Sequence, residues 1–163
     1  MIKLLMIGDT HLRVKNPDKR VDDFRAAMMA KLREILEIRV QREPDGVIHL
    51  GDLYDAVHPS YDLQDEALDL LSAGGSLDIL AGNHDMHAHN PTTVRYTAFG
   101  HALRRCPNWL QSIGHVTGIG GRTFVDAFDR SVVRVNGFDF EHDFEEMIKR
   151  EDSPLIQTWP DDC

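Results

Sequence analysis

The sequence predicts an α/β fold in which helices flank a mainly parallel central sheet. Three short apolar runs, at residues 2–8, 47–50 and 77–80, are separated by two segments in which apolar residues recur at helical spacing. Strands that alternate with helices along a chain are typical of right-handed crossovers and a parallel sheet. A polar cluster follows closely after each apolar run, so we expect the three clusters to meet at one edge of the sheet.

The first half of the chain supplies most of this pattern. Residues 2–8 are solidly apolar, as expected for a central strand that is covered on both faces. From residue 21 to residue 42 the apolar residues follow a helical period, and acidic side chains in the first turn suit the helix dipole. Residues 47–50 are then a second buried strand, residues 62–72 a second helix and residues 77–80 a third strand.

The second half of the chain has weaker periodicity. The sequence predicts a helix over 93–105, a β-hairpin over 131–140 that turns at Asn136-Gly137, a short helix over 144–149 and a strand over 155–159. With 163 residues and no linker, the chain is expected to form one domain over 1–163.

Composition excludes several classes of protein. A charged share of 28% and an apolar share of 42% are typical of globular proteins, and no apolar stretch is long enough for a membrane helix. The net charge of −9 argues against a broad basic surface for nucleic acid, although acidic residues could still concentrate divalent cations that attract phosphate. The two cysteines, Cys106 and Cys163, lie far apart, which favours a reducing cytoplasm.

The three polar clusters carry the chemistry. Carboxylate, imidazole and amide oxygen ligands suit cations such as Mn, Fe or Zn. Two such ions about 3.5–4 Å apart clamp a phosphoryl group and supply a hydroxide nucleophile at neutral pH. A carboxylate that bridges both ions must come from the middle strand, which makes Asp52 the candidate, and Gly8, Gly51 and Gly82 leave room for tight turns. The clusters are Asp9-Thr10-His11, Gly51-Asp52-Leu53-Tyr54-Asp55 and Gly82-Asn83-His84-Asp85.

The ordered series D-x-H, G-D-x-x-D and G-N-H-D resembles the calcineurin-like metallophosphoesterase superfamily. The fuller forms Gly8-Asp9-Thr10-His11-Leu12 and Gly51-Asp52-Leu53-Tyr54-Asp55 are similar to the branch that contains the nuclease subunit of SbcCD-type DNA repair complexes. The motifs span residues 8–85, about half of the chain. The resemblance implies a metallophosphoesterase-like layered fold, with an incomplete C-terminal part.

The resemblance also implies residue roles. Asp9 and His11 would hold the first metal ion, Asp52 would bridge, and Asn83 would hold the second ion. His84 and Asp85 would be catalytic: His84 would stabilise or protonate the leaving group, and Asp85 would orient its ring. Asp55 would brace the loop or a ligating histidine.

The chain departs from the superfamily after these motifs. The superfamily continues with a lone histidine and then a G-H-x-H motif, whereas Gly114-His115-Val116-Thr117 lacks the second histidine. The chain is therefore expected to be truncated before its last ligands, through a natural end or a fragment. The missing ligands would come from waters, from a partner chain or from local histidines such as His115 and His142.

The leading hypothesis is a Mn-dependent phosphodiesterase of the SbcD type that acts on DNA, with an ATPase partner subunit or a second copy of the chain as partner. The alternatives are a small-molecule phosphodiesterase or phosphatase on the same site, and a catalytically impaired metal-binding interaction domain.

Other polar residues have simpler interpretations. His49 lies within a strand and is expected to be a core histidine. The spacing H-x-x-H-x-H of His84, His87 and His89 suggests zinc, but an exposed loop is the plainer interpretation. A basic run after the first motif is either a solvated loop or a contact for a nucleic-acid backbone. Its members are Arg13, Lys15, Lys19 and Arg20.

Overall fold

The structure is a computed structural model that describes residues 1–114, 116–126, 128 and 130–138. The predicted helix over 144–149 and strand over 155–159 lie outside these residues. The described elements are β1 (Leu4–Ile7), α1 (Phe24–Arg42), β2 (Gly46–His49), α2 (Tyr61–Ser72), β3 (Leu77–Ile79), the 3-10 helices η1 (Asn83–Asp85), η2 (His87–His89) and η3 (Pro91–Tyr96), α3 (Ala98–Arg105), β4 (Leu110–Ser112), β5 (Gly121–Val125) and β6 (Val132–Asn136).

The described residues form a four-stranded sheet in the order β1-β2-β3-β4, in which every neighbouring pair is parallel. The predicted α/β class and parallel sheet are therefore confirmed. Strand β4 was not predicted from the sequence, because it is only three residues long and carries an exposed glutamine at its centre. The carboxyl ends of β1, β2 and β3 lie at one edge of the sheet.

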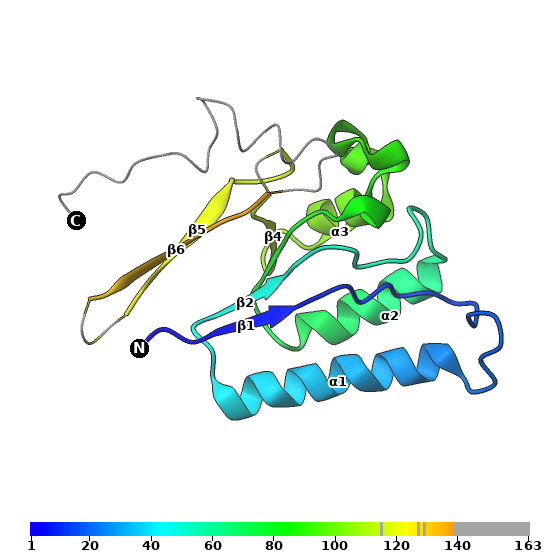
Figure 1. Cartoon of the computed structure of the whole chain (residues 1–163), viewed down its shortest axis with the longest axis horizontal. Helices are drawn as coiled ribbons and strands as arrows, with labels where there is room; N and C mark the ends of the chain where they lie inside the picture. Colours follow the sequence, from blue (N-terminus) through cyan, green and yellow to red (C-terminus); the bar gives the residue numbers. More distant parts are fainter. Residues whose placement is uncertain (115, 127, 129, 139–163) are drawn as a thin grey trace.

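Helices and strands form layers on the two faces of the sheet (Figure 1). α1 and α2 lie side by side along one face, and α3 packs against α2. The main core lies between these helices and the sheet. A smaller apolar cluster lies on the other face, where Phe124 of β5 packs against Ile48 of β2 and Ile113 beyond β4. The β5–β6 hairpin thus forms a third layer.

Helix α1 begins three residues later than the sequence predicted. The Asp23 side chain accepts a hydrogen bond of 3.0 Å from the Ala26 amide and so caps the helix, while Val21 is fully exposed. At the other end Glu43 takes a left-handed conformation with φ of 47°, and its amide donates to the Arg39 carbonyl at 2.9 Å. The first helical residue is therefore set by the capping side chain and not by the apolar period.

The predicted helix over 93–105 is divided in two. Thr97 ends η3 and starts α3, because its hydroxyl accepts the Gly100 amide at 3.3 Å. Gly100 also lies so close to η3 that an added Cβ would be 2.1 Å from the Val94 carbonyl oxygen.

The predicted hairpin turn at Asn136-Gly137 is wrong. Residues Val132–Asn136 form one strand, β6, which pairs antiparallel with β5, so the chain reverses between Val125 and Val132. Gly137 instead forms a parallel bridge with Gly114, and an added Cβ there would be 1.9 Å from the Ile113 carbonyl oxygen. The glycine is required for a close backbone approach and not for a turn.

Within the described part of the chain, no helix combines the length and the apolar character needed to cross a membrane.

Candidate metal centre

The loops that follow β1 and β2 remain paired beyond the ends of the strands. The His11 amide donates to the Asp52 carbonyl at 2.9 Å, and the Leu12 amide donates to the Leu53 carbonyl at 3.0 Å. The Asp55 amide then donates back to the Leu12 carbonyl at 3.1 Å. This pairing brings the first and second motifs together at the carboxyl edge of the sheet.

Three of the predicted metal ligands have an unusual backbone conformation. The φ angles of Asp9, His11 and Asp52 are 38°, 42° and 51°, in the left-handed region that side chains other than glycine rarely adopt. Such a conformation costs on the order of 1–3 kcal/mol per residue, and it persists only where the surrounding structure imposes it. Strained residues of this kind cluster at active sites and ligand clamps.

The side chains of His11, Asp52 and His84 converge. One potential ligand atom from each lies within 4.8 Å of the other two. The Nε2 atom of His11 is 3.7 Å from an Asp52 carboxylate oxygen, and the His11 and His84 rings meet edge to face at 4.7 Å between centroids. A separation of 3.7 Å is too long for a hydrogen bond but suits two ligands of one cation.

Glycines allow Asp52 to reach the loop after β3. An added Cβ on Gly82 would be 2.2 Å from the Asp52 Oδ1 atom, and Gly51 has a φ of 107°. The Asp52 Oδ1 atom accepts the His84 amide at 2.8 Å. The tight turn expected at Gly51 is therefore confirmed, Gly82 leaves room for the Asp52 side chain, and an added Cβ on Gly8 would point into open space.

The ring of His84 is held by a backbone carbonyl. Its Nδ1–H donates to the Asp55 carbonyl oxygen at 2.8 Å, which leaves Nε2 as the nitrogen available for chemistry. The expectation that Asp85 orients this ring is wrong, because the Asp85 Oδ2 atom accepts the Gly82 amide at 3.0 Å. Asp85 therefore closes the turn that carries His84 and does not contact the ring through this oxygen.

The Asp85 carboxyl is buried, at 2% exposure. Burial raises the pKa of Asp85 to about 7, and the negative charge of Asp52 acts in the same direction, while hydrogen bonds from the backbone amides of Gly82, Asp52 and Leu53 oppose the shift.

Asp55 contacts the neighbouring His11 and Arg13 side chains, as expected for a bracing residue. One carboxylate oxygen is 3.8 Å from the His11 Nδ1 atom, which has no hydrogen-bond partner among the described residues, and the other is 3.2 Å from Arg13. Arg13 therefore belongs to the site loop, and Arg20 pairs with Asp22. Half of the basic run after the first motif is thus engaged with carboxylates of the chain itself.

His49 and Thr10 form a hydrogen-bonded chain beneath the ligands. The His49 Nδ1 atom accepts the Gly51 amide at 3.2 Å, so its Nε2–H donates to the Thr10 hydroxyl at 3.1 Å. That hydroxyl donates to the Leu53 carbonyl at 3.0 Å. His49 is fully buried, as predicted, and burial lowers its pKa to about 4.

The sequence motifs do not predict this positioning role, although Thr10 lies between two predicted ligands. The signal that could have found it is a hydroxyl at a strand end opposite a buried histidine on the next strand.

The structure therefore brings together three of the six predicted site residues. Asp9 is exposed at the end of β1, and it lies outside the converging group. Asn83 opens η1 and is half-buried. The roles of Asp9 and Asn83 as ligands stay predictions, and His115 and His142 lie outside the described residues.

The comparisons with known proteins agree with this geometry. A family profile described as calcineurin-like phosphoesterase matches residues 2–161. The chain is also 25% identical over 158 residues to the "DNA double-strand break repair protein Mre11" of Methanosarcina acetivorans. That alignment covers 91% of this chain and 24% of the relative, so the chain spans about a quarter of the length of that protein. The predicted family is confirmed, and this chain belongs to the calcineurin-like phosphoesterase family.

Proposed function

We propose that the chain is a divalent-metal-dependent phosphodiesterase that hydrolyses DNA, of the type found in SbcD-like repair nucleases. The observation that carries the proposal is the convergence of His11, Asp52 and His84 at the carboxyl edge of the sheet, with a strained backbone at His11 and Asp52. The similarity to a protein named for DNA double-strand break repair supports DNA as the substrate class.

The converging residues fit a metal ion. The imidazole of His11 and the carboxylate of Asp52 suit Mn, Fe or Zn, and the Nδ1 atom of His11 has no hydrogen-bond partner among the described residues. In our proposal Asp9 and His11 would hold one ion, Asn83 would hold a second ion and Asp52 would be a ligand of both, with Mn as the metal. The ions would neutralise phosphate charge and lower the pKa of bound water.

The residues of the chain itself supply positioning and a proton. The Asp55 carbonyl fixes the His84 ring through Nδ1, so that Nε2 of the protonated ring donates to the leaving oxygen of the phosphodiester. The Asp52 carboxylate holds the His84 backbone through its amide, which links the bridging ligand to the acid in one rigid unit. The chain of hydrogen bonds through Thr10 and His49 fixes the backbone on which His11 stands.

The partners belong to the proposal as well. DNA would be the substrate, and an ATPase subunit or a second copy of this chain would bind beside the nuclease domain. Such a partner, or His115 and His142, would supply ligands beyond those of the three motifs. We also propose that the protein works in a reducing cytoplasm, as expected from its two widely spaced cysteines.

The substrate class is tested by comparing three phosphoesters under saturating Mn²⁺. We expect hydrolysis of a short linear DNA and of bis(p-nitrophenyl) phosphate, and little hydrolysis of the monoester p-nitrophenyl phosphate. Efficient hydrolysis of the monoester or of a cyclic nucleotide, with intact DNA, would instead assign a phosphatase or a small-molecule phosphodiesterase. The matched control is His101→Ala, which changes an exposed histidine of α3 outside the converging group.

A further inference from the structure

Two exposed histidines outside the converging group face each other. His58 lies in the loop between β2 and α2, three residues after Asp55, and His87 lies in η2, three residues after His84. Their Nε2 atoms are 3.2 Å apart, and their ring centroids are 5.1 Å apart. The spacing of histidines in the sequence did not suggest this pair, because the two residues come from different loops.

The separation of the two nitrogens suits one tetrahedral cation. With a Zn–N distance of about 2.05 Å, two nitrogens 3.2 Å apart subtend an angle of about 100° at the metal, close to the tetrahedral value. The same separation is at the upper limit for a hydrogen bond between a ring N–H and a ring nitrogen. Both rings are exposed, so neither is brought to the other by burial.

The backbone around the pair is held firmly. The amide of His87 donates to the Thr93 hydroxyl at 2.9 Å, and its carbonyl accepts the Asn90 amide at 3.0 Å. On the other side, the Val57 carbonyl accepts the Ala98 amide at 3.0 Å, which ties the His58 loop to the start of α3.

The residues that follow His87 are strained. Ala88 and His89 have φ angles of 46° and 57°, and two successive left-handed residues without glycine are costly. Such strain is typical of ligand clamps.

Space for further ligands lies beside His58. A pocket of about 340 Å³ is lined by His58, Tyr61, Gln64, Tyr96 and His101, among others. Because both rings are exposed, water molecules could complete the coordination of an ion that has only two protein ligands. A site with two imidazoles and open positions exchanges its metal readily, unlike a closed structural site with four protein ligands.

We propose that His58 and His87 form a second cation site, separate from the centre at His11 and Asp52, which takes a transition metal such as Zn²⁺, Ni²⁺ or Cu²⁺. Imidazole ligands favour these cations over Mn²⁺, which follows from the order of affinities of divalent metals for nitrogen sites. The ion joins the loop that carries Asp52 and Asp55 to the loop that carries His84. Occupancy therefore stabilises the relative position of the two catalytic loops.

Metal titration of the whole chain tests this proposal. Ni²⁺ binding is measured by equilibrium dialysis in the Asp52→Asn background, which weakens the other centre, for three variants: His58→Ala, His87→Ala and His101→Ala. We expect the first two to bind one Ni²⁺ at least tenfold more weakly than the parent, while His101→Ala, which alters the same pocket without the pair, keeps the parent affinity. Mn²⁺ binding should be the same in all four proteins.

Equal Ni²⁺ affinity in the parent and in all three variants would overturn the proposal, and so would an equal loss in His101→Ala. Circular dichroism checks that the variants fold. As a second measurement, electron paramagnetic resonance of Cu²⁺ on the parent should show coupling to two imidazole nitrogens of the pair, and one of these couplings should be lost in His58→Ala. A spectrum unchanged in His58→Ala would mean that the two rings share only a hydrogen bond.

Discussion

At the residue scale, the position of His84 suits either of two roles. Its ring lies beside His11 and within the group of potential metal ligands, and its Nδ1–H is committed to the Asp55 carbonyl. The remaining nitrogen, Nε2, could either hold a cation or carry a proton to a leaving group. The resemblance to the superfamily favours the second role, and kinetics can separate the two.

We expect His84→Asn to lower kcat for bis(p-nitrophenyl) phosphate by about 10²–10⁴-fold, because the variant lacks an acid but keeps an amide of similar size. The Mn²⁺ concentration that gives half-maximal activity should change little. An unchanged kcat together with a large rise in that concentration would make His84 a metal ligand instead of an acid.

Burial of His49 makes the stability of the protein depend on pH. Its folded-state pKa is about 4, below the ordinary value of 6.5, because burial disfavours the charged ring. The unfolded chain therefore binds the extra proton between these two values, so the free energy of unfolding falls as the pH falls from 6.5 to 4. The size of this effect is on the order of 3 kcal/mol.

In His49→Gln the amide keeps a donor toward the Thr10 hydroxyl but has no proton to gain. We expect its urea-unfolding midpoint to change less between pH 7 and pH 4.5 than that of the wild type. If the two proteins lost stability in parallel over this range, His49 would not be the group responsible.

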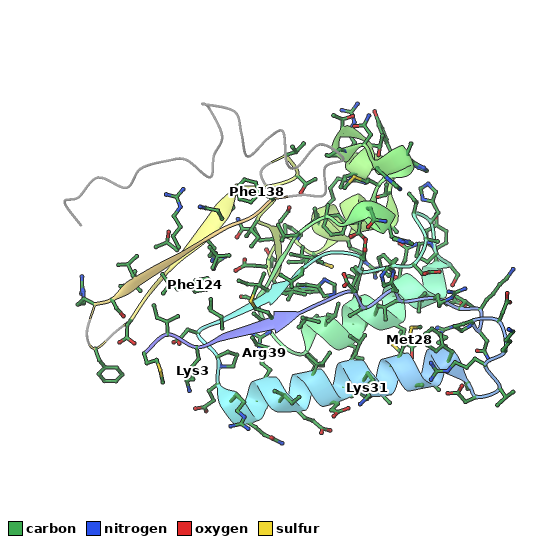
Figure 2. The ribbon with its side chains drawn as sticks, in the orientation of Figure 1. Lys3, Met28, Lys31, Arg39, Phe124 and Phe138 are labelled. Carbon is green, nitrogen blue, oxygen red and sulfur yellow. The ribbon has the colours of Figure 1, made fainter. Side chains whose placement is uncertain are left out.

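At the element scale, the third layer depends on one aromatic residue. Phe124 points from β5 toward the sheet and is 9% exposed (Figure 2). Its ring lies directly over β2, since an added Cβ on Gly46 would be 2.3 Å from it. The ion pair between Arg122 of β5 and the buried Asp78 of β3, at 2.9 Å, fixes the same strand at the sheet.

Phe124→Ala should lower the free energy of unfolding by about 3 kcal/mol, from lost burial and the cavity left behind. Val125 faces away on the same strand and is 56% exposed, so Val125→Ala should change stability by less than about 0.5 kcal/mol. Chemical denaturation of both variants measures the difference. Equal effects would show that the hairpin does not depend on the second apolar cluster.

The elements that the sequence predicted well are those with strong local signals. β1, β2 and β3 are short apolar runs and α2 has a clear apolar period, and these elements and α1 lie within about three residues of their predicted positions. The prediction of a turn at Asn136-Gly137 was wrong because the same dipeptide also suits a strand end with close backbone packing. The contact of Gly137 with Ile113 determines that the dipeptide ends a strand and does not form a turn, and no local sequence pattern encodes this long-range contact.

The candidate site likewise has some features that local sequence patterns predict and others that depend on long-range contacts. The motifs placed Asp52 and His84 at the correct edge, because strand ends in a parallel sheet converge by topology. The partner of the His84 ring, the Thr10–His49 chain and the His58–His87 pair depend on how two loops fold against each other. These contacts join residues about 30 or 40 positions apart, and sequence spacing does not encode them.

At the scale of the whole molecule, bound metal would allow a negatively charged chain to bind negatively charged DNA. With a net charge of −9, the chain has no general attraction for a phosphate backbone, and half of its basic run is paired with carboxylates. Divalent cations at the sheet edge would supply the local positive charge that the protein lacks. Binding of DNA should accordingly depend on the metal.

The central claim is that the three motifs of this chain form a working metal-dependent phosphodiesterase centre. The most direct measurement is Mn²⁺-dependent hydrolysis of bis(p-nitrophenyl) phosphate and of a short DNA by the wild type and by Asp52→Ala. We predict hydrolysis that requires Mn²⁺, is lost with a chelator and falls by at least about 10³-fold in Asp52→Ala, since this residue is the proposed bridge. Absence of hydrolysis by the wild type at saturating metal, or equal rates in the two proteins, would contradict the account.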